Sequence, residues 1–154
     1  MGSSSIVEAV KLSNSGRQSW DDYFISIADT VSTRATCERL KVGCVFVRDN
    51  FILSTGFNGA LAGQRHCIEV GCLLHEAHCV RSAHAEINAI AQAARHGVSL
   101  ENSWLYVTHL PCIKCYVSVL ATGCSRVYYR HNYGTADMKL YYELQGMSRL
   151  EQVK

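Results

Sequence analysis

The sequence contains no apolar run near the roughly 20 residues that a membrane-spanning helix requires. Its first residues, Met1 to Ser5, lack the apolar centre of a secretory signal peptide. The net charge is only +2, which is too small to indicate a long nucleic-acid groove. Internal repeats and low-complexity segments are also missing. We therefore expect a cytoplasmic protein that binds neither membrane nor nucleic acid.

What the sequence does contain is the composition of one folded domain. Its 154 residues are close to the commonest size of a single domain, and 48% of them are hydrophobic. The polar start predicts a flexible arm over residues 1–18, followed by a single domain over residues 19–154. Eight cysteines are many for a reducing compartment, and they indicate metal binding or catalysis rather than disulfides.

Helical and strand patterns alternate along the chain. Apolar residues recur at helical spacing after Ser19, which forms a pattern resembling a capping box with Asp22. Two β-rich runs, 42–47 and 51–55, predict an antiparallel hairpin. Further helices are predicted over 82–96, 111–122 and 135–145, and further strands over 104–108, 126–130 and near 148–153. Pro111 is expected at the first position of its helix. This order predicts an α/β fold with helices on both faces of a mixed sheet.

Three potential metal ligands occur at the predicted starts of two helices. His84 begins one helix, and Cys112 and Cys115 begin the next. Cysteines three positions apart in a helical turn lie on one face, so both sulfurs can reach one ion. Zinc suits thiolate and imidazole ligands, and the positive end of a helix favours the thiolate form. Three protein ligands leave a fourth position for water, as in catalytic zinc sites.

Glu86 follows the histidine by two residues. Two residues turn an ideal helix by about 200°, so His84 and Glu86 reach one site only at the very end of the helix. There Glu86 could take a proton from zinc-activated water and later protonate a departing amine. The pattern His-x-Glu followed by Pro-Cys-x-x-Cys is the signature of zinc nucleobase deaminases. The alternative is a capping His84, a solvated Glu86 and two small core cysteines.

Further motifs surround these residues. They are Arg34-Ala35-Thr36-Cys37, Lys41-Val42-Gly43, Gly56-Phe57-Asn58-Gly59, Gly71-Cys72, His78-Cys79 and Tyr106-Val107-Thr108-His109-Leu110. With the catalytic pattern they make the chain resemble the deoxycytidylate deaminases of bacterial and phage type, within the cytidine deaminase superfamily. The resemblance implies a three-layer fold with a mixed five-stranded sheet. It also implies deamination of dCMP to dUMP and ammonia, which supplies dUMP for thymidylate synthesis.

The resemblance also assigns roles at the substrate. Zinc-activated water would attack ring carbon 4, while Glu86 serves ring nitrogen 3 and the leaving amine. The backbone carbonyl of Leu110 is expected to orient that amine, Asn58 to bind the sugar hydroxyl and Tyr129 to lie near the substrate. Arg34 is a candidate for the phosphate of the substrate or of a regulatory nucleotide. From the residues alone, Asn58 is equally compatible with a turn, and Tyr129 is better explained as a core residue.

Four further cysteines provide a second possible metal site. They are Cys37, Cys67, Cys72 and Cys79. Four sulfurs form a closed structural zinc site, and such a site would order the long loop over residues 60–81. Histidines of the same loop compete as ligands: His66, His75 and His78. Free thiols around a loop are the alternative.

Assembly and regulation follow only from the resemblance. Members of this family are often homohexamers that dCTP activates with Mg²⁺ and dTTP inhibits. Three other functions share the same zinc core. A deaminase of bases within tRNA or single-stranded DNA would need an electropositive channel and stacking aromatics. A nucleoside deaminase would be indifferent to the phosphate, and a zinc-stabilised interaction module would not need Glu86.

Overall fold

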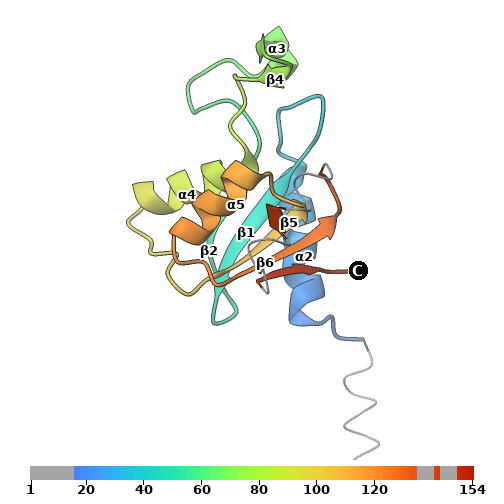
Figure 1. Cartoon of the computed structure of the whole chain (residues 1–154), viewed down its shortest axis with the longest axis vertical. Helices are drawn as coiled ribbons and strands as arrows, with labels where there is room; N and C mark the ends of the chain where they lie inside the picture. Colours follow the sequence, from blue (N-terminus) through green and yellow to red (C-terminus); the bar gives the residue numbers. More distant parts are fainter. Residues whose placement is uncertain (1–15, 135–140, 143–148) are drawn as a thin grey trace, which may run out of the picture.

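A computed structural model describes residues 16–134, 141–142 and 149–154 (Figure 1). Its main sheet has five strands in the order β2-β1-β5-β6-β7. The strand β1 (Gly43–Arg48) is antiparallel to β2 (Phe51–Phe57) and to β5 (Trp104–His109). Beyond β5, the strands β6 (Arg126–His131) and β7 (Leu150–Gln152) continue in parallel. The predicted mixed five-stranded sheet is therefore confirmed.

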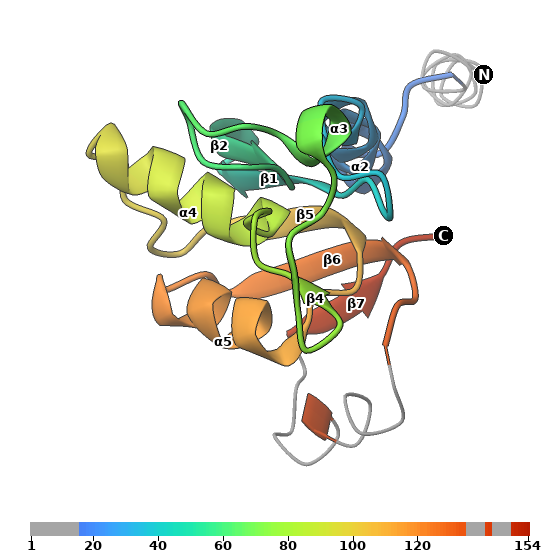
Figure 2. The same ribbon diagram turned by 90° about the horizontal axis from the view of Figure 1, so that it is seen from above.

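Helices cover both faces of this sheet. One face packs against α2 (Trp20–Ser32), and the other packs against α4 (Ala85–Arg95) and α5 (Ile113–Ala121) (Figure 2). Successive side chains of β1 point to opposite faces, so Val45 joins the cluster with α2 and Phe46 joins the cluster with α4 and α5. Burial on both faces explains why this strand is a continuous apolar run.

Local sequence explains where the first elements begin and end. The Ser19 hydroxyl accepts a hydrogen bond of 3.1 Å from the Asp22 N–H, so it caps α2 as predicted. The predicted hairpin is confirmed, and its turn consists of Asp49 and Asn50 with φ of 52° and 60°. Aspartate and asparagine tolerate this left-handed conformation, which a two-residue hairpin turn requires.

The predicted start of the helix over 82–96 is wrong by three residues. The helix α4 begins at Ala85 rather than Ser82. The reason is an antiparallel bridge between Ala83 and Gly59, which exchange backbone hydrogen bonds of 3.1 and 2.9 Å. Ala83 therefore belongs to an extended segment, and His84 becomes the N-cap residue of the helix.

The expected place of Pro111 is also wrong. The helix α5 begins at Ile113, and Cys112 is its N-cap residue with φ −67° and ψ 161°. Pro111 therefore lies before the helix instead of at its first position. Because proline fixes φ near about −65°, it fits this extended connection as well as it fits a first helical turn.

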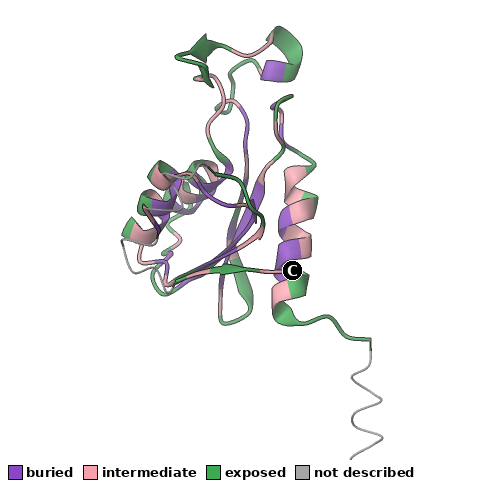
Figure 3. Cartoon of the chain, turned by 45° about the vertical axis from the view of Figure 1, so that its right-hand side comes forward, coloured by how far each residue is buried: buried purple, intermediate pink, exposed green. Residues whose placement is uncertain are grey.

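Residues 60–81 project from the body of the domain and are called the insertion below (Figure 1). The insertion contains a short helix, α3 (Cys67–Val70), and a small antiparallel sheet of β3 (Leu74–His75) and β4 (His78–Cys79). Most of its side chains are exposed or half-buried, whereas Cys67 is buried (Figure 3). The predicted long loop thus contains short elements around its cysteines.

Parts of the sequence predictions lie outside the described residues. These are most of the arm expected over residues 1–18 and most of the helix expected over 135–145, of which Tyr141 and Tyr142 are described and are helical. The predicted last strand is confirmed by β7. Within the described ranges, no helix is long and apolar enough to cross a membrane.

Candidate active site

Two helix N-termini meet at the predicted zinc ligands. His84 is the N-cap of α4, Cys112 is the N-cap of α5, and Cys115 lies in the first turn of α5. The Nδ1 atom of His84 lies 3.7 Å from the sulfur of Cys112 and 3.3 Å from that of Cys115. Ligand atoms around tetrahedral zinc are about 3.5–3.8 Å apart when two are thiolates and one is imidazole. The three side chains therefore fit a zinc ion.

The two cysteines converge although only one of them is helical. Cys112 was expected inside the first helical turn, but it occupies the extended N-cap position. An N-cap side chain reaches across the first turn toward the third helical residue, which here is Cys115. The Cys115 thiol, and less strongly His84, lower the pKa of Cys112 to about 4. The Cys112 thiolate, which is the zinc-binding form, is therefore favoured at neutral pH.

Glu86 completes what we call the catalytic cluster, with His84, Cys112 and Cys115. It is the second residue of α4 and only 4% exposed, so the interpretation of Glu86 as a solvated side chain is wrong. The geometric condition on His84 and Glu86 is met because the histidine lies outside the helical turn. Burial raises the pKa of Glu86, while the charges of His84 and contact with Cys115 act in the opposite direction. A carboxyl group with a raised pKa is suited to accept and return protons.

The strand β2 holds the first turn of α4 in place. The side-chain amide of Asn88 donates a hydrogen bond of 2.8 Å to the Phe57 carbonyl. At Gly56 the strand passes so close to the helix that an added Cβ would lie 2.2 Å from the Ala85 carbonyl oxygen. Only glycine fits this approach without a shift of the helix, so the packing of β2 fixes where His84 and Glu86 lie.

Two predicted substrate residues have structural roles. The buried Asn58 side chain accepts a hydrogen bond of 2.8 Å from the Val42 N–H and donates one of 2.7 Å to the Leu40 carbonyl. It therefore stabilises the segment before β1. Tyr129 is half-buried and packs against the core cluster beneath α4 and α5. Their contacts with a substrate stay predictions.

Arg34 is exposed and lines a pocket of about 670 Å³. The pocket lies between the loop after α2 and the insertion, and its other charged lining residues are the cationic Lys41 and the acidic Glu38. The four residues of the catalytic cluster do not line it. Cationic side chains around a cavity favour anionic ligands such as phosphate.

Three of the four predicted sulfurs of the second site lie together. The sulfurs of Cys67, Cys72 and Cys79, called the thiol cluster below, are within 4.8 Å of one another. Those of Cys67 and Cys79 are 3.6 Å apart. Cys37 is buried but lies outside this group. Burial acts against ionisation of Cys79, but neighbouring backbone N–H groups outweigh it and lower the pKa of this thiol to about 7.

His66, a competing ligand for the second site, has another partner. Its Nδ1 atom lies 2.9 Å from the hydroxyl oxygen of Thr36, next to Cys37 in the sequence. Partial burial and the Cys79 thiol raise the pKa of Cys72, and Cys37 is close enough to add to this shift.

One further group lies beside the catalytic cluster and belongs to none of the sequence motifs. The Tyr142 hydroxyl donates a hydrogen bond to the Pro111 carbonyl, directly before the predicted ligand Cys112. Tyr142 belongs to no motif, and a tyrosine in a predicted helix is ordinarily a core residue. No signal in the sequence could have connected it with a residue 31 positions earlier.

Comparisons with known proteins identify the family of this chain. The family profile described as "Cytidine and deoxycytidylate deaminase zinc-binding region" matches residues 18–131. The chain belongs to this family. ComE operon protein 2 of Bacillus subtilis is 44% identical over 119 residues, which cover 77% of this chain and 63% of that protein. The chain therefore spans less than two thirds of the length of this relative.

Other relatives of this family are matched over nearly their whole length. The deoxycytidylate deaminase of Mycobacterium phage D29 is 38% identical over 125 residues, which cover 73% of this chain and 95% of that protein. The crystal structure of dCMP deaminase from the cyanophage S-TIM5, in complex with dCMP and dUMP, has 29% sequence identity and a TM-score of 0.73. It covers 86% of this chain and 95% of the cyanophage chain.

Proposed function

We propose that this protein catalyses the zinc-dependent hydrolysis of dCMP to dUMP and ammonia. The observation that carries this proposal is the buried carboxyl of Glu86 beside three side chains that fit zinc. Metal binding alone does not require such a carboxyl, whereas hydrolytic deamination requires a group that moves protons. The choice of dCMP is supported by the deoxycytidylate deaminase of phage D29 and by the cyanophage structure with dCMP and dUMP.

In the catalytic cluster, three residues are assigned as zinc ligands and the fourth is assigned to proton transfer. His84, Cys112 and Cys115 would hold zinc, which supplies Lewis acidity that makes water nucleophilic near neutral pH. Glu86 takes a proton from the attacking water and delivers it to ring nitrogen 3, as the water oxygen bonds to carbon 4. Glu86 then carries the second proton to the amine, and the bond between carbon 4 and this nitrogen breaks. One water is consumed and one ammonia leaves.

Three further groups are assigned to the substrate. The Leu110 carbonyl accepts a hydrogen bond from the leaving amine. Asn58 binds the sugar hydroxyl, which is compatible with its structural role because an amide makes up to four hydrogen bonds and only two are used by Val42 and Leu40. Tyr129 lies near the substrate at the edge of the core.

Arg34 is assigned to a nucleotide phosphate in the pocket that it lines with Lys41. The pocket lining does not include the catalytic cluster. Two phosphates are therefore candidates, that of dCMP and that of a regulatory nucleotide. The family resemblance supports activation by dCTP with Mg²⁺, inhibition by dTTP and a homohexamer. In Arg34→Ala, loss of dCMP affinity alone identifies the first possibility, and loss of the response to dCTP alone identifies the second.

A second, structural zinc is assigned to the thiol cluster, with Cys37 as the fourth ligand. The sulfur separations suit zinc, and the hydrogen bond between His66 and Thr36 leaves Cys37 as the favoured remaining ligand. Four thiolates around zinc form a closed site without a position for water. Such a site would stabilise the insertion rather than take part in the reaction.

A nucleotide panel tests the proposed function. Zinc-loaded protein would be incubated with dCMP, deoxycytidine, single-stranded DNA or tRNA, with and without dCTP and dTTP. Ultraviolet absorbance would measure the rate of deamination of each substrate. We expect turnover of dCMP and a rate with deoxycytidine that is lower by about a hundredfold or more, since a charged phosphate contact is lost. Equal rates on both would indicate a nucleoside deaminase. Activity on DNA or tRNA alone would identify a nucleic-acid deaminase, and no activity on any substrate would favour an interaction module.

A further inference from the structure

The connection from β5 to α5, residues 110–112, carries two groups that the proposed reaction needs. Cys112 is a zinc ligand, and the Leu110 carbonyl is assigned to the leaving amine. The hydrogen bonds of α5 do not hold the backbone of this connection. They begin only with the bond of 2.9 Å from the Tyr116 N–H to the Cys112 carbonyl. Something else must fix its backbone.

Two hydrogen bonds from later parts of the chain hold this connection. The Leu110 N–H donates to the carbonyl of His131, the last residue of β6, at 2.9 Å. The Tyr142 hydroxyl donates to the Pro111 carbonyl. Pro111 is buried, and a buried carbonyl almost always has a hydrogen-bond donor. Among the described residues, none donates to the Leu110 carbonyl, so this group is left for a ligand.

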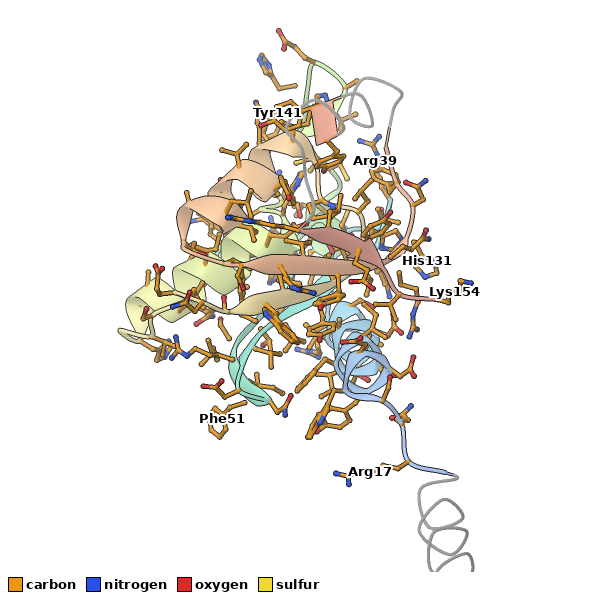
Figure 4. All side chains as sticks on the ribbon, turned by 60° about the horizontal axis from the view of Figure 1, so that its bottom comes forward. Arg17, Arg39, Phe51, His131, Tyr141 and Lys154 are labelled. Atoms are coloured by element: carbon orange, nitrogen blue, oxygen red, sulfur yellow. The ribbon has the colours of Figure 1, made fainter. Side chains whose placement is uncertain are left out.

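Tyr142 is well placed for this role. It is buried, and its ring packs edge-on against the ring of Tyr116 in α5, with centroids 5.1 Å apart. The neighbouring Tyr141 is labelled beside the N-terminal end of α5 in Figure 4. Burial raises the pKa of Tyr142. The hydroxyl therefore stays protonated and acts as a donor.

We propose that Tyr142 is a positioning residue of the zinc site. Its hydroxyl fixes the peptide between Pro111 and Cys112, which orients the Cys112 thiolate and leaves the Leu110 carbonyl available to the leaving amine. The second part rests on the proposed function, whereas the orientation of Cys112 concerns the metal site alone. A residue that follows β6 would thus complete a site whose ligands all lie at the N-termini of α4 and α5.

The variant Tyr142→Phe removes the hydroxyl and keeps the ring. We expect an about tenfold fall in kcat on dCMP with little change in KM, and an about tenfold weaker affinity for Zn²⁺ in competition with a chelator, as for other groups that orient metal ligands. The visible absorption bands of the Co²⁺-loaded full chain should also shift, because they report the ligand geometry. A merely structural role would lower Tm and leave these bands and kcat unchanged.

Tyr116→Phe is the matched control. It removes the other hydroxyl of the same buried ring pair, and this hydroxyl has no hydrogen-bond partner in the described part of the chain. It should match the unaltered protein in all three readouts. The proposal is wrong if Tyr142→Phe also matches the unaltered protein, or if Tm is the only quantity that falls in Tyr142→Phe. If the unaltered protein does not deaminate dCMP, the proposed function fails, while zinc affinity and the cobalt bands still test Tyr142.

Discussion

The catalytic cluster and the thiol cluster each contain three potential metal ligands whose ligand atoms lie within 4.8 Å of one another, but on very different supports. The catalytic cluster lies at the N-termini of α4 and α5, two helices that pack on the central sheet. The thiol cluster lies in the insertion, on a four-residue helix and a two-stranded sheet away from the main core (Figure 1). The packing of α4 and α5 on the sheet supports the catalytic cluster. The thiol cluster has no such support within the insertion, so a metal bound there would stabilise the insertion.

The two clusters also differ in the group that accompanies the ligands. The catalytic cluster includes the buried Glu86 beside its three potential ligands, and the raised pKa of Glu86 suits proton transfer. The thiol cluster contains only sulfur atoms as potential ligands, and Cys37 lies outside this group. A zinc site with an open position and an adjacent base is suited to hydrolysis, while a site closed by four thiolates is suited to stability. The ligand count alone would not separate these roles.

The largest expected effect tests this difference in the catalytic cluster. Glu86→Gln keeps the size of the side chain but removes the group that carries protons. We expect kcat on dCMP to fall by about 10³-fold or more, which matches the usual contribution of a general acid and base. Elemental analysis should find the zinc content unchanged, because Glu86 is not a ligand. Full turnover, or loss of zinc, would contradict the division between ligands and base.

The second prediction tests whether the catalytic cluster depends on the packing of β2 against α4. In Gly56→Ala the new Cβ would meet the Ala85 carbonyl oxygen at 2.2 Å, so the first turn of α4 must move. A displacement of about 1 Å can cost a hundredfold in rate, and we expect kcat to fall by about tenfold to a hundredfold together with Tm. Gly16→Ala, which meets nothing within 4 Å, is the control. Unchanged kinetics would show that the support is less rigid than we infer.

The convergence of His84, Cys112 and Cys115 could be predicted from the sequence because these residues belong to two short motifs at helix starts. Helix starts have local signals, and the order of helices and strands determines that these two starts meet. The predicted boundaries failed where distant residues intervene. Ala83 pairs with Gly59 instead of starting α4, and Cys112 adopts the extended N-cap conformation instead of joining α5.

The remaining groups depend on contacts that no local pattern contains. The hydrogen bond from Tyr142 to Pro111 joins residues 31 positions apart, and no motif connects them. The thiol cluster shows the same limit, because the sequence offers four cysteines and three histidines for four positions. Only the fold shows that Cys67, Cys72 and Cys79 lie together and that His66 contacts Thr36.

The third prediction concerns the thiol cluster. Cys72→Ser should reduce the zinc content of metal-replete protein from two ions per chain to one, because serine is a poor zinc ligand. We expect Tm to fall by about 5 °C, since a loss of roughly 1–2 kcal/mol lowers Tm by a few degrees in a domain of this size. The kcat at low temperature should change by less than about twofold, since the catalytic cluster has its own support.

His78→Asn is the control for this prediction. It alters an exposed side chain of β4, next to Cys79, and should keep both zinc ions. An unaltered protein with one zinc per chain would reject the second site. A large loss of kcat in Cys72→Ser would show instead that the insertion and the catalytic cluster are not independent.

The smallest expected effect concerns the histidines beside the connection that carries Cys112. The rings of His109, at the end of β5, and His131, at the end of β6, have centroids 5.0 Å apart (Figure 4 labels His131). Burial lowers the pKa of His109, the charge of His131 lowers it further, and Asp29 acts in the opposite direction. The folded protein thus binds this proton less readily than the unfolded chain does.

The sign of the pH dependence follows from this lowered pKa. Above the unfolded value of about 6.5, both states hold a neutral His109 and stability is complete. As the pH falls toward the folded value, the unfolded chain gains protons first, so Tm decreases. His131→Asn removes one of the two causes, so the fall in Tm between about pH 7.5 and 5.5 should become smaller without vanishing, because burial remains. His75→Asn, on the exposed strand β3, should leave this slope unchanged. If both variants keep the slope of the unaltered protein, the strand ends beside the catalytic cluster are no more sensitive to pH than the insertion.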